Sequence, residues 1–265
     1  QGQTLDEVKD LFLAEIEKLK KGEFDEGLLE ASINNYKLMQ MQRMDSNDGR
    51  ADMFVSSFID GVDWKDEVAS LDRMSKVTKQ QIVDFANKYF GDNYALIYKK
   101  QGKDPNEKKI DKPKITPIVM NRDSSSLFLK EIQASTVAPI EPVFLDYDKD
   151  LQKLTAKSDI PVLYKENTSN DIFTLMYVFD MGMNNDKIMG TAFEYMQYLG
   201  TSKKSLKEIN EEFYRLACYF RVVPGSDRTY VVLTGLKESM PKAMALFEEI
   251  LADAQVNKEA YAGLA

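Results

Sequence analysis

The sequence contains no histidine, and this absence removes much of the metal and acid–base chemistry open to a protein of this size. Without histidine there is no Ser-His-Asp or Cys-His arrangement, no histidine general base and no zinc site built on imidazole nitrogens. The chain also has a single cysteine, Cys218. One cysteine forms neither an internal disulfide nor a thiolate cage around a metal. Because Cys218 lies in an apolar run, we expect an unreactive core residue.

Long hydrophobic runs and excess positive charge are also lacking. No apolar run approaches the roughly 20 residues that span a bilayer, so the sequence predicts no membrane span. The 43 acidic and 35 basic residues give a net charge of −8, which argues against nucleic acid as a partner. No phosphate-binding loop, dinucleotide fingerprint or EF-hand spacing occurs. The chain has 265 residues, of which 43% are hydrophobic. This length and composition are typical of one or two globular domains.

Residues 1–99 are predicted to be mostly helical. Thr4-Leu-Asp-Glu7 is a capping-box pattern, and apolar residues then recur at helical spacing until Gly22. Further helices are expected over about 25–44, 49–59, 64–74 and 77–89, followed by a short strand at Tyr94–Lys99. A single strand needs partners. We therefore expect this segment to be the second part of a domain whose other strands lie upstream.

Residues 100–142 read as a linker. Lysines crowd positions 99–114, and prolines at five positions prevent continuous helix or interior strand. At most a short helix is expected, at 127–132. The lysine run is better explained by a solvated connection between domains than by an anion site.

Residues 143–265 are predicted to form an α+β domain, with helices packed on one face of an antiparallel sheet. Strands at 161–165 and 172–179 are expected to pair as a hairpin. The second of them is apolar on both faces, which predicts a central strand. Strands at 218–223 and 229–233 flank a turn at Pro224–Asp227, and helices are expected from 190 to 199, after the capping box at Ser205, and over 237–254.

The stretch from Gly190 to Thr201 is the candidate site. As a helix it places Thr191, Glu194 and Tyr195 at i, i+3 and i+4, on one face. A metal-binding helix uses this spacing when histidines hold the outer positions and a carboxylate the inner one. Here the outer positions carry hydroxyls, so from the residues alone an ordinary amphipathic helix explains the stretch best.

Together with Leu199-Gly-Thr201, these residues resemble the insulinase/pitrilysin family of zinc metallopeptidases, which carry His-x-x-Glu-His followed by a hydrophobic run and Gly-Thr. Thr191 and Tyr195 fall at the histidine positions and Glu194 at the glutamate. Other pieces resemble the family in its own order, and they lie at 77–98, 140–147, 170–173, 179–182, 212–214 and 233–236.

The resemblance implies a clam-shell protein of two halves, with zinc in the first half and a degenerate second half that helps enclose a peptide. Residues 1–99 would end the second domain, 100–142 would be the hinge between halves, and 143–265 would form most of the third, inactive domain. This chain would then bind no zinc and be inactive alone, with zinc in the upstream half. Glu194 would make a structural hydrogen bond, and peptide contact would use a sheet edge or shape. A periplasmic or cell-envelope location is implied by the resemblance alone.

Two other classes of function remain open. The parent protein could be an inactive family relative that acts as a structural or partner subunit, which an upstream sequence lacking His-x-x-Glu-His would indicate. Alternatively, the chain could be an unrelated binding module of mostly helical character. Cooperative folding of residues 1–99 in isolation would favour that class.

Overall fold

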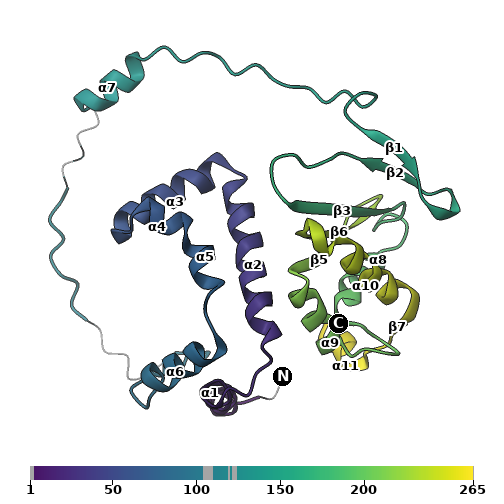
Figure 1. Ribbon diagram of the computed structural model, residues 1–265, viewed down its shortest axis with the longest axis horizontal. Helices are drawn as coiled ribbons and strands as arrows, with labels where there is room; N and C mark the ends of the chain where they lie inside the picture. The colour runs from purple at the N-terminus through teal and green to yellow at the C-terminus, as the bar shows by residue number, and fades with distance from the viewer. Residues whose placement is uncertain (1–2, 104–109, 119, 121–123, 265) are drawn as a thin grey trace. The chain divides into compact units, whose positions relative to one another are not determined.

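Helices dominate the first ninety residues of the computed structural model, which describes residues 3–103, 110–118, 120 and 124–264 (Figure 1). The described helices here are α1 (Leu5–Lys21), α2 (Gly27–Met44), α3 (Asn47–Asp60), α4 (Trp64–Val68), α5 (Ser70–Met74) and α6 (Lys79–Tyr89). The chain divides into two compact units. One comprises residues 1–95 and 167–265, and the other comprises residues 96–166.

The predicted start and stop signals of α1 are confirmed. At the start of α1, the Thr4 hydroxyl accepts from the Glu7 N–H at 3.2 Å, and the Glu7 carboxylate accepts from the Thr4 N–H at 2.7 Å. This reciprocal pair satisfies two backbone donors that the first turn leaves open. Gly22 ends the helix in the left-handed region at φ 71°, where a residue without a Cβ is favoured.

Two expectations for this segment are wrong. The helix predicted over 64–74 breaks at Ala69 into α4 and α5. The Arg73 guanidinium donates to the Asp66 carbonyl at 2.6 Å, so a side chain takes an acceptor that a continuous helix would use. Residues 94–99 are in no sheet among the described residues, because a strand forms only beside a neighbour.

The main sheet has three antiparallel strands, in the order β3 (Ile172–Phe179), β6 (Thr229–Leu236), β5 (Cys218–Pro224). The register sets Leu175 opposite Leu233, and Leu233 opposite Phe220. The predicted turn between β5 and β6 is confirmed. The central position predicted for β3 is wrong: in the described part of the chain β6 is central, because it is the strand buried on both faces.

The hairpin predicted between 161–165 and 172–179 is also wrong. The strand β2 (Pro161–Tyr164) pairs with β1 (Gln152–Thr155), which the sequence did not reveal. The Ala156 N–H bonds to the Ile160 carbonyl at 2.8 Å and closes this shorter loop. At the start of β3, the Ile172 N–H donates to the Asn170 side chain, and the Asn167 side chain donates to the Ile172 carbonyl. These side chains occupy backbone groups that a neighbouring strand would need for pairing.

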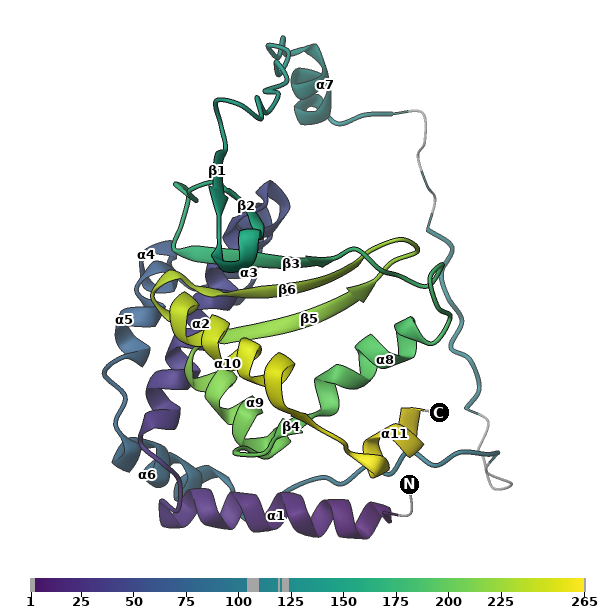
Figure 2. The ribbon, with the colours of Figure 1, turned by 90° about the vertical axis from the view of Figure 1, so that its right-hand side faces the viewer.

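Helices α9 (Leu206–Arg215) and α10 (Met240–Asp253) cover one face of the three-stranded sheet (Figure 2). Phe247 of α10 and Leu233 of β6 are both fully buried at their centre. Burying a side chain of this size stabilises the fold by roughly 1.5–3 kcal/mol. The buried members of this core are Phe173, Ile209, Phe213, Cys218, Val231, Leu233, Ala243, Leu246, Phe247 and Ile250.

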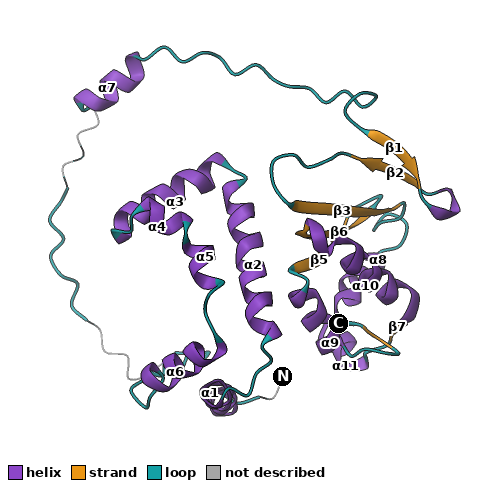
Figure 3. Ribbon diagram, in the orientation of Figure 1, coloured by secondary structure: helices purple, strands orange, loops and turns teal. Residues whose placement is uncertain are grey.

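The remaining elements complete the α+β fold that the sequence predicted (Figure 3). Beside the core lie α8 (Met189–Tyr195), the strand pair β4 (Gly200–Thr201) with β7 (Ala254–Gln255), and α11 (Lys258–Leu264). The other unit contains α7 (Leu127–Ala134) and the β1–β2 pair. Among the described residues, no helix is both long and apolar enough to cross a membrane.

Candidate functional site

The three predicted site residues all lie in α8, but the helix is shorter than expected. It ends at Tyr195, a turn of 3-10 helix covers Met196–Tyr198, and Gly200–Thr201 is strand β4. A Cβ at Gly200 would lie 2.7 Å from the Lys204 carbonyl oxygen. Only glycine fits where the chain passes this backbone so closely, so the Gly-Thr pair lies in β4, directly before a tight turn, and not in the helix.

Tyr195 is bonded to the segment before α11. Its hydroxyl donates to the Asn257 carbonyl at 2.7 Å and accepts from the Asn257 N–H at 2.6 Å. Its ring meets the Tyr261 ring edge-on, with 5.7 Å between centroids. The phenol oxygen therefore hydrogen-bonds both the N–H and the carbonyl of Asn257. Tyr195 is a structural contact between α8 and the start of α11.

Thr191 and Glu194 are both exposed to solvent. Within the part of the chain that the structure describes, the Glu194 carboxylate makes no hydrogen bond or ion pair, so the structural bond expected of it is not formed there. A carboxylate in water keeps its hydration and has no neighbour to make it a base. The three side chains therefore lie on one helix but make no hydrogen bond to one another and share no partner among the described residues, so they do not form a reactive site.

A zinc ion does not fit these residues. Neutral hydroxyls are poor zinc ligands, the phenol of Tyr195 is already bonded to Asn257, and one carboxylate does not hold a catalytic zinc. Elsewhere in the described ranges, no three Cys, Asp or Glu side chains gather as metal ligands would. We therefore derive no reaction step through a metal on this chain.

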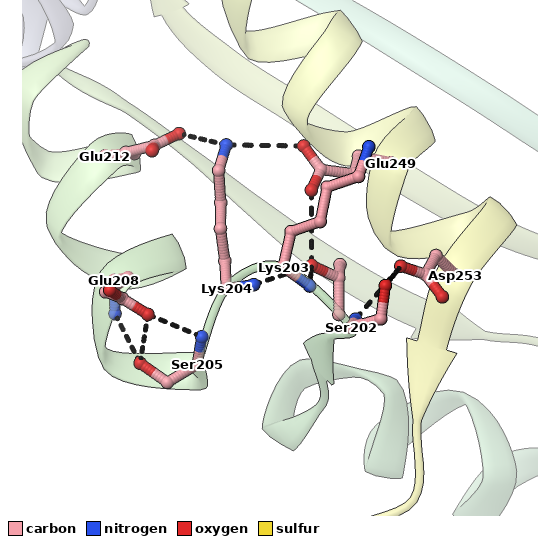
Figure 4. A network of polar contacts seen from close by, with 9 residues as sticks. Ser202, Lys203, Lys204, Ser205, Glu208, Glu212, Glu249 and Asp253 are labelled. Atoms are coloured by element: carbon pink, nitrogen blue, oxygen red, sulfur yellow. Dashed lines mark hydrogen bonds and ion pairs between the residues drawn. The ribbon is translucent and has the colours of Figure 1, made fainter.

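The turn after β4 carries a polar network that the sequence did not predict (Figure 4). Lys204 Nζ lies 2.8 Å from Glu212 Oε2 and 3.3 Å from Glu249 Oε2, so it joins α9 to α10. The Thr201 hydroxyl donates to Glu249 Oε1 at 3.2 Å. Hydrogen bonding to Glu212, with a further contribution from Glu249, raises the pKa of Lys204. A lysine held charged in this way stabilises the turn and does not act as a base.

A second part of the network bonds the same turn to the end of α10 and to the start of α9. Ser202 donates to Asp253 Oδ2 through its N–H at 2.9 Å and through its hydroxyl at 2.5 Å, and these bonds lower the pKa of Asp253. The predicted capping box is confirmed: the Glu208 N–H donates to the Ser205 hydroxyl, and the Ser205 N–H donates to Glu208 at 2.7 Å. These bonds hold the turn, α9 and α10 together, and they leave no side chain of the network free to act as a catalytic group.

Cys218 is buried, as expected, with 4% of its surface exposed. Burial raises the pKa of its thiol to about 12. The thiolate, which is the nucleophilic form, is therefore scarce at neutral pH. Cys218 is a core residue and not a catalytic one.

A shallow groove runs between α2, α5, α9 and β5. The Asn35 side chain donates to the Tyr214 carbonyl at 2.7 Å, and the Gln42 side chain donates to the Tyr219 hydroxyl at 3.0 Å. These amides are satisfied within the protein, and tyrosine and methionine side chains make up much of the rest of the lining. Its lining residues are Ser32, Asn35, Tyr36, Leu38, Met39, Gln42, Met74, Tyr214 and Tyr219.

Comparison with known proteins finds similarity only among solved structures. No protein-family model matches the chain, and no curated protein matches it. A periplasmic protease, PqqL, from Escherichia coli aligns over 98% of this chain and 31% of its own length, with 12% identity and a TM-score of 0.41. A peptidase M16 inactive domain from Pseudomonas fluorescens (22% identity, TM-score 0.39) and a protease from Helicobacter pylori (13%, 0.38) each align over 43% of this chain.

The chain spans less than a third of each of these proteins, with 29% of the Pseudomonas domain and 28% of the Helicobacter protease aligned. All three identities are below 25%, and all three TM-scores are below 0.5. Similarity at this level assigns neither a fold nor a function to this chain. The activity of any of these proteins does not extend to this chain on that ground.

Proposed function

We propose that this chain is a non-catalytic segment of a zinc-dependent endopeptidase or oligopeptidase. The proposal rests on the side chains that α8 carries at the motif positions. Thr191, Glu194 and Tyr195 keep the spacing of His-x-x-Glu-His before Gly-Thr, while Tyr195 bonds to Asn257 in a way that leaves it no role at a metal. A duplicated fold that retained the helix and lost the zinc accounts for both facts.

The proposed roles follow the three segments of the sequence. Residues 143–265 would wall a chamber that holds a peptide, residues 100–142 would act as the hinge between two halves, and residues 1–99 would complete the second domain. The zinc would be bound by the other half of the parent protein. A periplasmic or cell-envelope location is part of the same proposal.

Zinc analysis and peptide hydrolysis test the non-catalytic role. The purified chain is incubated with excess zinc, passed through a desalting column and assayed for bound metal and for cleavage of quenched fluorescent peptides. We expect substoichiometric zinc and no turnover. One bound zinc per chain together with hydrolysis would overturn the proposal.

Photo-crosslinking tests the wall role separately. An unstructured peptide with a benzophenone side chain is compared with a disulfide-closed peptide of the same composition. We expect crosslinks from the extended peptide within residues 143–265, and fewer from the closed one. Equal labelling by both probes, or labelling confined to residues 1–99, would refute a wall for extended peptides.

A further inference from the structure

Helix α3 has an exposed apolar face that the proposed function leaves unexplained. Its inner face is buried at Met53 and Ser57, with 6% and 7% of their surface exposed. On the outer face, Val55, Phe58 and Ile59 are 54%, 87% and 73% exposed. These three positions follow i, i+3 and i+4, so their side chains form one stripe along the helix.

Two aromatic residues extend the apolar surface beside this stripe. Phe54 is 53% exposed, and its ring lies 4.3 Å from the ring of Trp64, centroid to centroid. Single exposed apolar residues are ordinary on a protein surface, but a contiguous group on one element marks an interaction site. The anchor spacing matches the way an amphipathic helix is recognised by a groove on another protein.

The charge around the stripe defines the kind of partner. Residues 43–67 hold seven acidic and three basic side chains, so this short stretch supplies half of the net charge of −8. By helical spacing, Asp48 and Asp52 lie on the same side of α3 as Val55 and Ile59.

Two of the three basic side chains in residues 43–67 already bond to groups within the same segment. Arg43 forms an ion pair with Asp52, and the Arg50 guanidinium bonds to the Met44 carbonyl and to Asn47. Asp52 is therefore compensated by Arg43, whereas the carboxylates of Asp48 and Asp60 form no ion pair among the described residues and leave the border of the stripe acidic.

We propose that the outer face of α3 is a docking site for a polypeptide whose apolar surface is bordered by lysine and arginine. Val55, Phe58 and Ile59 would bury against that apolar surface, and the acidic border of α3 would set the orientation. The proposed function assigns the peptide wall to residues 143–265, so a failure of docking at α3 would leave that wall role untouched.

A second copy of the chain does not fit this face. Face-to-face pairing of two α3 stripes would bring two copies of this segment together, each with a net charge of −4 over residues 43–67. Like charges set against each other across an interface weaken binding. A partner with the opposite charge turns the same groups into favourable contacts.

The single tryptophan, Trp64, gives a direct optical test in the full chain. The probe is a synthetic amphipathic helical peptide with a leucine stripe bordered by lysines, titrated while Trp64 emission is recorded. The reference peptide has glutamate in place of each lysine. The variant F58Q/I59Q replaces two of the three stripe residues with glutamine, a good helix former. Both positions are exposed, so we expect the circular dichroism to stay unchanged.

The matched control is L11Q/F12Q on α1. Leu11 and Phe12 are also adjacent and exposed, at 57% and 70%, but α1 holds five acidic and four basic residues. We expect the lysine peptide to bind with a shift in Trp64 emission and more weakly in high salt. F58Q/I59Q should weaken binding at least about tenfold, while L11Q/F12Q should leave it within about twofold.

Three results would overturn the proposal. These are equal binding by F58Q/I59Q, equal binding of the glutamate peptide, and self-association in sedimentation experiments that F58Q/I59Q abolishes. The last result would make a second copy the occupant of the face.

Discussion

Tyr195 illustrates how one side chain can keep a position in a motif and lose the chemistry of that position. Its phenol is long enough to reach the backbone of Asn257, where it accepts one hydrogen bond and donates another. A histidine at this position would instead offer a ring nitrogen as a metal ligand. The replacement exchanges a ligand for a contact between two helices.

Removing the hydroxyl of Tyr195 should destabilise the protein. In Y195F the Asn257 N–H loses its acceptor at a half-buried position, while the Asn257 carbonyl keeps the Tyr261 N–H as a donor at 3.0 Å. We expect the free energy of unfolding to fall by about 1–2 kcal/mol. Urea denaturation measures the loss, and hydrogen exchange should show faster exchange at the Asn257 amide. The control is Y198F, because Tyr198 is 40% exposed. Unchanged urea midpoint and unchanged Asn257 exchange in Y195F would refute the structural role.

Cys218 should be unreactive until the protein unfolds. Burial raises the pKa of its thiol to about 12, so little thiolate is present or accessible at pH 8. We expect slow labelling by a disulfide reagent in native buffer and complete labelling in guanidinium. The variant S226C places a second thiol at an exposed turn position and should label at once. Native labelling of Cys218 as fast as that of S226C would contradict its place in the core.

At the scale of elements, signals confined to a few residues predicted the structure best. The capping boxes at Thr4 and Ser205 and the turn between β5 and β6 depend on residues within five positions of each other. The pairing of β3 depends on β6, whose paired residues lie fifty or more positions later, and on side chains of the Asn167–Asn170 turn. Alternation of apolar residues identifies a strand but does not identify its partner.

The side-chain cap at Ser205 should contribute more to stability than Ser239, which begins α10. S205A removes the acceptor of the Glu208 N–H, and we expect a loss of about 1 kcal/mol in unfolding free energy. S239A is the matched control, since Ser239 begins α10 without a side-chain cap bond. Thermal or urea unfolding compares the two variants. Equal destabilisation by S205A and S239A would show that the capping bond contributes nothing.

The same cap gives stability a defined dependence on pH. Hydrogen bonds from the Ser205 backbone and hydroxyl lower the pKa of Glu208 below its ordinary value of 4.5. The folded state therefore binds this proton less readily than the unfolded state, so the cap's contribution is present above pH 4.5 and is lost as pH falls through the folded-state value. We expect E208Q to show a smaller loss of stability than the parent protein between neutral pH and this acid range. An identical acid dependence in both proteins would argue against the cap.

At the scale of the whole molecule, the α+β class was predictable and the polar network was not. Helical periodicity, the β5–β6 turn and the apolar strands all indicated the class. The Lys204 network joins residues 204, 212 and 249, which come together only after α9 and α10 have packed on the sheet. The candidate site was predictable in position, because Thr191, Glu194 and Tyr195 fall on one helix, whereas the bond from Tyr195 to Asn257 depends on where α11 packs.

The linker hypothesis for residues 100–142 leads to a test on the intact chain. A protease needs an extended, accessible segment of several residues, and a helix supplies one only after local unfolding. Residues 110–118, as far as they are described, contain no helix or strand, and Ile115 and Ile118 are 82% and 87% exposed. Lys242 is also exposed, but it lies within α10 beside the fully buried Ala243.

Brief trypsin digestion should therefore cleave after Lys114 well before Lys242, as read by mass spectrometry of the fragments. The next bond upstream, after Lys112, precedes Pro113 and should resist trypsin, so K114Q should slow cleavage in this region without changing the rest of the pattern. If cleavage after Lys114 is no faster than cleavage after Lys242, residues 110–118 are held as firmly as a packed helix. In that case a hinge between two halves would have to lie elsewhere in the chain, because a hinge needs residues whose backbone angles can change at little cost in packing.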